Sequence, residues 1–234
     1  MISLDVATIT LAKGQHETCE DGMCLFEAYN QITRREQTDA CPPGVSPVLH
    51  IYGMRLNDVL PDDRRQELKR YLPNGTDVLA GTAGDGLDGV RAWMALDWLI
   101  RVYAPAWLDL AGLAGEASAL RNLAPVTDSA TAEAARLAGA AAGDAARAAA
   151  WAAAWAAARD AAWAAAWAAA GAAARDAAWD AAGAAAGDAA RDAARAAARD
   201  AAWAAAGAAL APTVARLQDS AIALYADLIT GGVS

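Results

Sequence analysis

Cysteine, long apolar runs and a basic leader are scarce or missing in this 234-residue chain, and each shortage excludes a class of protein. Three cysteines are too few for the disulfide framework of a small secreted domain, so we expect free thiols or a metal site. The charge-free stretch 161–174 has 14 residues, whereas a membrane-spanning helix needs about 20 apolar residues. The start lacks a basic segment followed by an apolar core, as a secretory signal would have. We therefore expect a cytoplasmic protein without a membrane partner.

Basic charge is also scarce, and the middle of the chain lacks proline and threonine. The chain has 19 Lys and Arg against 28 Asp and Glu, so it lacks the positive field that attracts nucleic acid, and we expect no nucleic-acid partner. No proline lies between Pro125 and Pro212, and alanine has the highest helix propensity, so that segment can be helical throughout. No threonine lies between Thr131 and Thr213. This argues against an alanine-rich ice-binding protein, because such proteins display a regular threonine row.

What the middle of the chain does contain is a four-residue repeat. From Gly139 to Gly207 every fourth residue is Gly, Arg or Trp, the next is Ala or Asp, and the following two are Ala, except for Leu210. A close-packed site rarely accepts side chains as different in volume as Gly and Trp. We therefore expect the invariant Ala rows to pack and the variable row to face outward. The outward side chains available to a partner are then Trp151, Trp155, Trp163, Trp167, Trp179, Trp203, Arg147, Arg159, Arg175, Arg191, Arg195 and Arg199.

Two explanations of the variable row remain open. Trp and Arg are enriched in binding hot spots, which favours selection for a protein partner. Codons for Gly, Arg and Trp are also interconverted by changes of one first base, which favours neutral expansion of a twelve-nucleotide repeat. A period of four residues drifts by about 40° per unit around a helix, so it does not form a coiled-coil seam, although rows spaced by four do pack.

Glycines decide between one long rod and several packed helices. Each interior Gly costs about 1 kcal/mol relative to Ala in a helix. The sequence AGAAAGDAAR occurs at 138–147 and again at 182–191, and in each copy a Gly can end one helix while Asp144 or Asp188 caps the next. We therefore expect an all-α fold in which a small helical domain is followed by several packed Ala-rich helices, rather than a rod of about 130 Å.

Outside the repeat the composition is that of a small globular domain. Apolar residues at helical spacing predict helices over 23–34, 47–60, 61–72, 87–113 and 212–229. Ser46 and Pro47 supply the N-cap and the first residue of the second helix, and the last helix should dock on another part of the protein. Loose alternation over 2–11 predicts one short strand. The chain thus divides into a mostly helical domain at 1–127, the repeat at 128–210 and an amphipathic C-terminal helix at 211–234.

Four possible metal ligands lie close together in the sequence. His16, Cys19, Cys24 and Cys41 supply the N and S donors of a closed tetrahedral zinc site. Their spacing is not that of a standard zinc finger, and the alternative is that Cys24 is a small buried residue. A third possibility pairs Cys24 as nucleophile with His16 or His50 as base, because a helix N-terminus lowers the pKa of a thiol. His50 lies among apolar residues, which is more typical of a packed core.

The residues of the helix expected over 87–113 are typical of packing and surface ion pairs and not of a catalytic site. Its tryptophans, Trp93, Trp98 and Trp107, are expected in the core, and Asp97 and Arg101 are expected to form a surface ion pair. The sequence contains no decisive catalytic signature. We therefore favour a non-enzymatic protein without a cofactor, with zinc as the alternative.

Three segments of the first half, HETCEDGMCLFEA, SPVLHIYGMRLNDVLPDD and RAWMALDWLIRVYAPAWLDLAGL, carry a family resemblance. They are similar to a family of uncharacterised actinobacterial and actinophage proteins, some of which bear similar alanine-rich tails. The resemblance implies a bacterial or phage-infected host cell and no particular reaction. We expect a structural or interaction protein that forms a homo-oligomer through its Ala rows. The alternative is a small zinc- or thiol-dependent protein in which the repeat is only an oligomerisation module.

Overall fold

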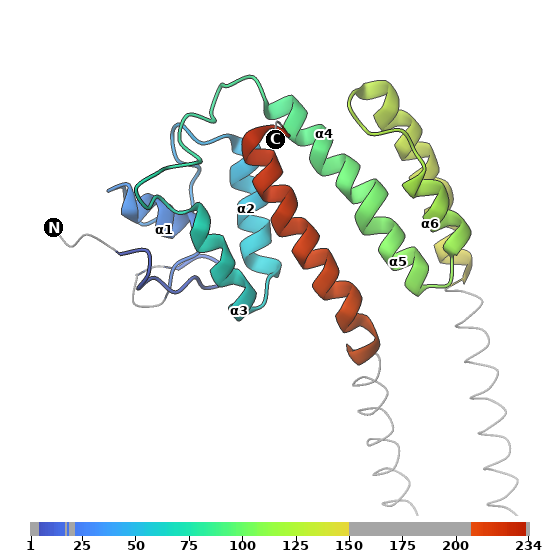
Figure 1. The fold of residues 1–234 in the computed structure, drawn as a ribbon, viewed down its shortest axis with the longest axis horizontal. Helices are drawn as coiled ribbons and strands as arrows, with labels where there is room; N and C mark the ends of the chain where they lie inside the picture. The colour runs from blue at the N-terminus through green and yellow to red at the C-terminus, as the bar shows by residue number, and fades with distance from the viewer. Residues whose placement is uncertain (1–4, 17, 19–21, 150–206, 233–234) are drawn as a thin grey trace, which may run out of the picture.

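The computed structural model describes residues 5–16, 18, 22–149 and 207–232, and the ordered elements of these residues are helices (Figure 1). They are α1 (Leu25–Ile32), α2 (Pro47–Val59), α3 (Asp62–Arg65), the 3₁₀ helix η1 (Gln66–Tyr71), α4 (Asp88–Trp98), the π turn η2 (Leu99–Tyr103), α5 (Ala104–Leu110) and α6 (Ala114–Arg121). Two more helices, at 129–149 and 207–230, border the undescribed segment. The expected all-α fold is confirmed.

The strand expected over residues 2–11 is wrong where the structure describes it. Residues 5–11 form no strand, and Leu11 makes only an isolated bridge with Met23. A side chain takes the place of a second strand: the Gln66 amide donates to Leu11 O and accepts from Leu11 N, both at 2.9 Å. Residues 6–8 form a turn, and Ile9 and Leu11 after it are buried beside η1.

Local capping signals set the starts of α1 and α2. The Ser46 hydroxyl accepts from the Leu49 N–H and Pro47 occupies the first turn, which confirms the expected start of α2. Helix α1 begins at Leu25 rather than at residue 23, because Cys24 is its N-cap and its sulfur accepts from the Glu27 N–H. The cap satisfies an N–H that the helix itself leaves free.

Helices α4 and α5 are joined through η2 into one helical stretch that runs through Pro105. Proline has no N–H to offer the carbonyl four residues before it. The π turn immediately precedes it, and there the N–H of Ala104 reaches the Leu99 carbonyl, five residues back. The helix expected over 87–113 is therefore present with a widened turn.

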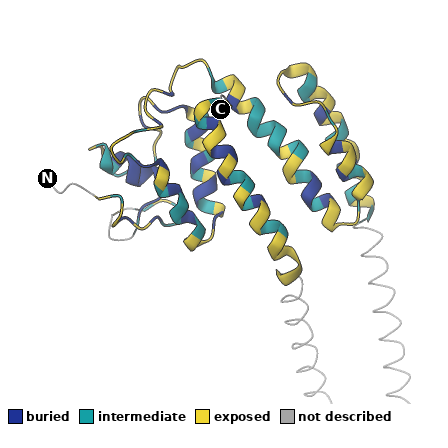
Figure 2. Cartoon of the chain, in the orientation of Figure 1, coloured by how far each residue is buried: buried dark blue, intermediate teal, exposed yellow. Residues whose placement is uncertain are grey.

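The tryptophans of this stretch are half-buried, and of the three that were expected in the core only Trp98 packs against the main core cluster. The buried residue of α4 is Arg91, while the exposed fraction of Val90 is 43% and that of Leu99 is 44%. Figure 2 shows the consequence, because α4 is mostly intermediate or exposed, whereas most of α1 is buried and α2 has several buried residues. The cause is position: α4 lies between other helices that contact only parts of its surface.

The main core is built from both ends of the chain. Phe26 and Leu49 of the first two helices pack with Ile222, Tyr225 and Leu228 of the helix 207–230. In Figure 1 this C-terminal helix lies between α2 and α4. Its expected docking is confirmed, and it docks on the N-terminal part. The ranges 1–127 and 211–234 consequently share one core.

The C-terminal helix begins earlier than expected. Residues 207–230 are helical, so Pro212 lies inside the helix and not at its start. An interior proline costs about 3 kcal/mol, but Ala208, Ala209 and Ala211 around it are strong helix formers. The burial of Tyr225 and Leu228, at 0% exposure, holds the later turns in place.

A glycine makes room for this docking. A Cβ atom added at Gly53 would lie 2.6 Å from Tyr225 Oη and 2.9 Å from Phe26 Cε2. The ring of Tyr225 stacks on Tyr52 with centroids 5.7 Å apart and meets Tyr71 edge-on at 4.8 Å. Both of these neighbours also donate hydrogen bonds to the C-terminal helix, Tyr52 to Ala221 O and Tyr71 to Ile222 O. Tyr225 is thus held between α2 and η1.

Replacing Gly53 with alanine tests this contact. We expect Gly53→Ala to destabilise the protein by about 1–3 kcal/mol, because the added methyl group overpacks the notch that holds Tyr225. Urea denaturation measures the free energy of unfolding. Gly115→Ala is the matched control: Gly115 also lies in a helix, its Cβ would have no neighbour within 4 Å, and a gain of about 0.5–1 kcal/mol is expected. Equal stability changes for both variants would contradict the account.

Candidate functional site

Two of the four expected zinc ligands meet at the start of α1, but a carboxylate lies between them. Glu27 is fully buried and accepts from His16 N at 2.7 Å and from Cys24 N at 2.7 Å. His16 Nδ1 lies 2.9 Å from the same carboxylate. One feature of the sequence could have indicated this arrangement, since a glutamate three residues after the N-cap is the pattern of a capping box. Glu27 therefore joins the backbone of His16 to the start of α1.

Cys24 is a poor nucleophile in this setting. Its side chain is buried, and burial raises the pKa of the Cys24 thiol to about 12, with the nearby Glu27 charge acting in the same direction. This raised pKa opposes the possibility of a Cys24 nucleophile activated by the helix N-terminus, because desolvation of the thiolate outweighs the backbone N–H groups. The thiol is protonated at neutral pH.

The other expected site residues lie in different surroundings. Cys41 is exposed, and its Sγ lies 3.5 Å from Val45 O. His50 packs edge-on against Phe26 at 4.5 Å, and its Nε2 lies 2.6 Å from Asp39 O, as a packing histidine would. Cys19 lies outside the described residues. Within the described ranges, no group of three or more His, Cys, Asp or Glu side chains gathers to hold a metal.

Thiol reactivity checks this placement. We expect iodoacetamide at pH 8 to alkylate Cys41 of the native protein and to leave Cys24 unmodified, because Cys24 is buried and protonated. Peptide mass spectrometry after timed alkylation measures both rates in one sample. The control is the same reaction in denaturant, where both cysteines should react alike. Native alkylation of Cys24 at the rate of Cys41 would show that the thiol is accessible and activated.

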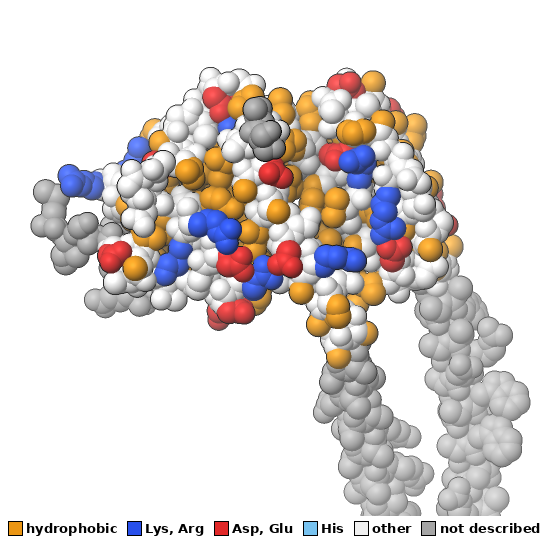
Figure 3. Space-filling model, in the orientation of Figure 1, with side chains coloured by type: hydrophobic (Ala, Val, Ile, Leu, Met, Phe, Trp, Pro, Cys, Tyr) orange, Lys and Arg blue, Asp and Glu red, His pale blue; other side chains and the backbone are white. Residues whose placement is uncertain are grey.

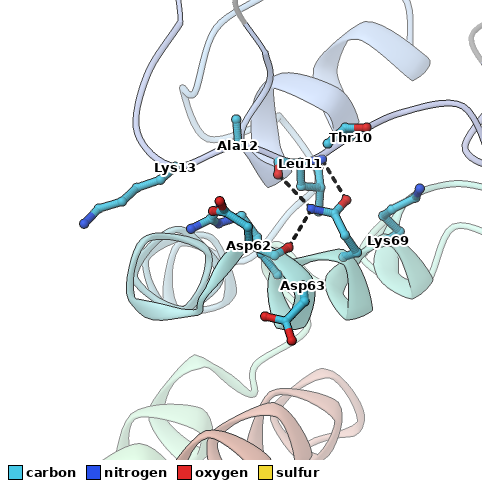
Figure 4. A pocket seen from close by; sticks show the side chains of 9 residues that line it. Thr10, Leu11, Ala12, Lys13, Asp62, Asp63 and Lys69 are labelled. Carbon is cyan, nitrogen blue, oxygen red and sulfur yellow. Dashed lines mark hydrogen bonds and ion pairs between the residues drawn. The ribbon is translucent and has the colours of Figure 1, made fainter. Parts of the chain in front are cut away.

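An open pocket of about 500 Å³ lies between residues 10–13 and the start of α3 (Figure 4). Arg65, at its wall, already donates to Asn57 O, Leu60 O and Asp62. In Figure 4 Lys13 points away from Lys69, and two aspartates of α3 balance the two lysines. This pocket offers no concentration of charge or of catalytic groups.

A buried arginine, Arg91, has more partners than any residue that the sequence singled out. Its guanidinium is fully buried and grips Asp85 with two bonds, Nη1 to Oδ1 at 2.9 Å and Nη2 to Oδ2 at 2.6 Å. Nε donates to Leu228 O at 2.9 Å, at the end of the C-terminal helix. Asp88 completes the group and also accepts from the Ser46 hydroxyl. Arg91 thereby caps helix 207–230, whose last carbonyls favour a positive charge.

Sequence reasoning missed Arg91 because its local pattern is ordinary. Asp85, Asp88 and Arg91 are spaced by three residues, which is typical of exposed helix pairs. The partner that buries the arginine lies 137 residues away in the chain. No local signal identifies such a partner.

Removing the charge of Arg91 should lower the free energy of unfolding. We expect Arg91→Met to destabilise the protein by about 3–5 kcal/mol, because carbonyls and carboxylates that it satisfies are left without a donor. Arg147→Met is the matched control, since the Arg147–Asp144 pair is 71% and 76% exposed and such pairs contribute at most about 1 kcal/mol. Thermal unfolding at pH 7 measures both.

The Arg91→Met variant should also differ from the wild-type protein in the pH dependence of its stability. Hydrogen bonds from Arg91 hold the pKa of Asp85 below its ordinary value of 3.8. A lowered folded-state pKa adds stability above the unfolded value, and this is lost as pH falls through the folded value. Wild-type protein should therefore lose stability on acidification below about pH 4 more steeply than Arg91→Met. Parallel acid profiles would contradict the Arg91–Asp85 interaction.

The first units of the repeat show how an Ala row packs. Ala142 is buried, and Ala138 and Ala146 in the same row pack against the second core cluster. That cluster is formed by α5 and α6 through Leu108 and Leu120. Arg147, the described member of the outward-facing set, is exposed and pairs with Asp144. Over these residues one of the two invariant Ala rows packs, whereas Ala141 of the other row is exposed.

The helix break expected at the first AGAAAGDAAR copy is wrong. Gly139, Gly143 and Asp144 all lie inside the helix 129–149. The cost of about 1 kcal/mol for each glycine is offset by the surrounding alanines and by packing on α5 and α6. The remaining expected interaction residues, Trp151, Trp155, Trp163, Trp167, Trp179, Trp203, Arg159, Arg175, Arg191, Arg195 and Arg199, lie outside the described residues, as does the second copy at 182–191.

Similarity adds no further constraint on the site. Comparisons with protein-family models, curated protein sequences and solved structures gave no match. In the described part of the chain, no helix has the length and apolar character that crossing a membrane requires. Function therefore follows from the described contacts and from the repeat pattern.

Proposed function

We propose that this chain is a non-enzymatic structural or interaction protein that forms a homo-oligomer through the Ala rows of its repeat. The observation that carries the proposal is the packing of Ala138, Ala142 and Ala146 against α5 and α6. The same row continues in the sequence beyond residue 149. Small side chains let helix backbones approach closely, so a long Ala row suits helix-to-helix contact between chains.

The attachment of the repeat supports this role. The helix 129–149 belongs to the second core cluster and the helix 207–230 to the main core. In Figure 1 the ends of both helices next to the undescribed segment lie on the same side of the body. The described helices on both sides of the repeat are therefore anchored in the body of the protein.

The outward row completes the proposal. The exposed Arg147 is its described example, and the Trp and Arg side chains of the remaining units would offer a protein partner aromatic and cationic contacts. We place this protein in the cytoplasm of a bacterial or phage-infected host cell, in the setting that the family resemblance implies, without nucleic-acid or membrane partners.

One observation favours the zinc alternative. His16 Nδ1 is engaged by Glu27, and metal-binding histidines commonly use one ring nitrogen for a carboxylate and the other for the metal. His16 Nε2 would then be the ligand atom, and binding by Cys24 and Cys41 would require these two thiols, which do not gather with His16 in the structure, to move toward it. The repeat would serve only for oligomerisation.

Native mass spectrometry of the full chain separates these proposals. A defined homo-oligomer without metal is expected, because the Ala rows rather than an ion would hold the chains together. One zinc per chain, lost on Cys24→Ser, would favour the alternative, and a metal-free monomer would contradict both. As a control, replacing the six repeat tryptophans with alanine should leave the number of chains in the oligomer unchanged. Loss of the oligomer in that variant would show that the outward row, not the Ala rows, carries assembly.

A further inference from the structure

Helix 129–149 contacts α5 and α6 through small side chains. The buried residues of this helix are Ala135 and Ala142, at 2% and 6% exposure. Its one large aliphatic side chain, Leu137, is 57% exposed and adds little to the contact. A buried methyl group removes much less apolar area from water than a buried Leu or Tyr side chain, so it stabilises a contact less. The helix is therefore weakly attached for its length.

Polar contacts show the same difference between the two helices that border the repeat. In the described part of the chain, side chains of helix 129–149 hydrogen-bond within the helix or at its start and not to α5 or α6: Glu133 with Arg136, Asp144 with Arg147, and Asp128 with Thr131. The C-terminal helix instead receives donors from the body at four successive residues: Arg64 to Asp219, Trp98 to Ser220, Tyr52 to Ala221 O, and Tyr71 to Ile222 O. Figure 3 shows basic and acidic side chains close together on the face of the body where this helix emerges.

The chain just before helix 129–149 has the arrangement of a hinge. Asp97 accepts from Val126 N at 2.9 Å, and Arg101 donates to Leu123 O at 3.2 Å. Val126 is 2% exposed, whereas residues 127–128 that follow it are exposed. Hinges are commonly a few loop residues at the end of an element. The helix can therefore move about residues 127–128 while Val126 stays in place.

We propose that helix 129–149 is a releasable strap, which leaves α5 and α6 while the main core stays folded. The role of the strap rests on the proposed self-association through Ala rows. In the closed state Ala138, Ala142 and Ala146 pack against the cluster of Leu108 and Leu120, so this part of the row is masked. A surface that is available only in an open fraction binds with an affinity reduced by that fraction. The strap thereby limits self-association.

Hydrogen exchange of the full chain tests the strap itself. Amides of residues 135–146 should exchange at least about tenfold faster than those of residues 217–229, after correction for intrinsic rates, because the strap opens without global unfolding. The protein is kept dilute, so that contacts between chains add no protection. Equal protection of the two helices would overturn the proposal.

Ile100→Val loosens the strap without changing an Ala row. A Cβ added at Gly139 would lie 3.7 Å from Ile100 Cδ1, and this variant removes that Cδ1 methyl group. Exchange of residues 135–146 should accelerate by about threefold to tenfold, with α1 and α2 still protected. Leu120→Ala, at a position 1% exposed, should act in the same direction and more strongly. Leu137→Ala is the matched control, since it changes an exposed residue of the same helix and should leave the exchange ratio unchanged.

The same variants test the masking of the Ala row. Analytical ultracentrifugation should show that Ile100→Val lowers the dissociation constant of the oligomer, by up to the factor by which the strap opens more often. Leu137→Ala should leave the dissociation constant unchanged. Faster exchange in Ile100→Val and Leu120→Ala without tighter assembly would overturn the masking role.

These outcomes keep the strap apart from the proposed function. A wild-type protein that stays monomeric contradicts the proposed self-association, and with it the masking role, while the exchange comparison still tests the strap. An oligomer in which helix 129–149 is as protected as the C-terminal helix, even in dilute monomer, contradicts the strap alone.

Discussion

One buried guanidinium, that of Arg91, joins parts of the chain that are far apart in sequence. It holds Asp85 of the loop before α4 and the Leu228 carbonyl of the C-terminal helix. A fully buried charge is tolerated only when its partners are complete. The C-terminal helix must therefore end beside α4, and the notch at Gly53 fixes the rotation of that helix by accepting Tyr225. The N-terminal body is complete only with the C-terminal helix in place.

This arrangement makes the alanine-rich repeat an insertion into one body instead of a tail. Both flanking helices are fixed by packing, one on α5 and α6 and the other in the main core. Neutral expansion and selection of the outward row for binding are both compatible with such an attachment.

Local signals in the sequence predicted a good part of the fold. Ser46 and Pro47 marked the start of α2, and the apolar spacing of the C-terminal helix indicated that it docks. The glycines at 139 and 143 wrongly indicated a helix break, because the cost of each glycine in a helix is smaller than the stabilisation from neighbouring alanines and from packing on α5 and α6. Pro212 wrongly indicated the start of the C-terminal helix for a similar reason, since burial of the later turns stabilises the helix on both sides of the proline.

The chemistry of the candidate site was less predictable than the fold. The pKa of Cys24 depends on how deeply the thiol is buried, and the burial of Arg91 depends on hydrogen bonds to carbonyls at the other end of the chain.

Hydrogen exchange tests the central claim, that the two ends form one body, most directly. Core amides of residues 217–229 should exchange with the same free energy of opening as those of α1 and α2. Release of the C-terminal helix at a clearly lower free energy, with α1 and α2 still protected, would contradict the account.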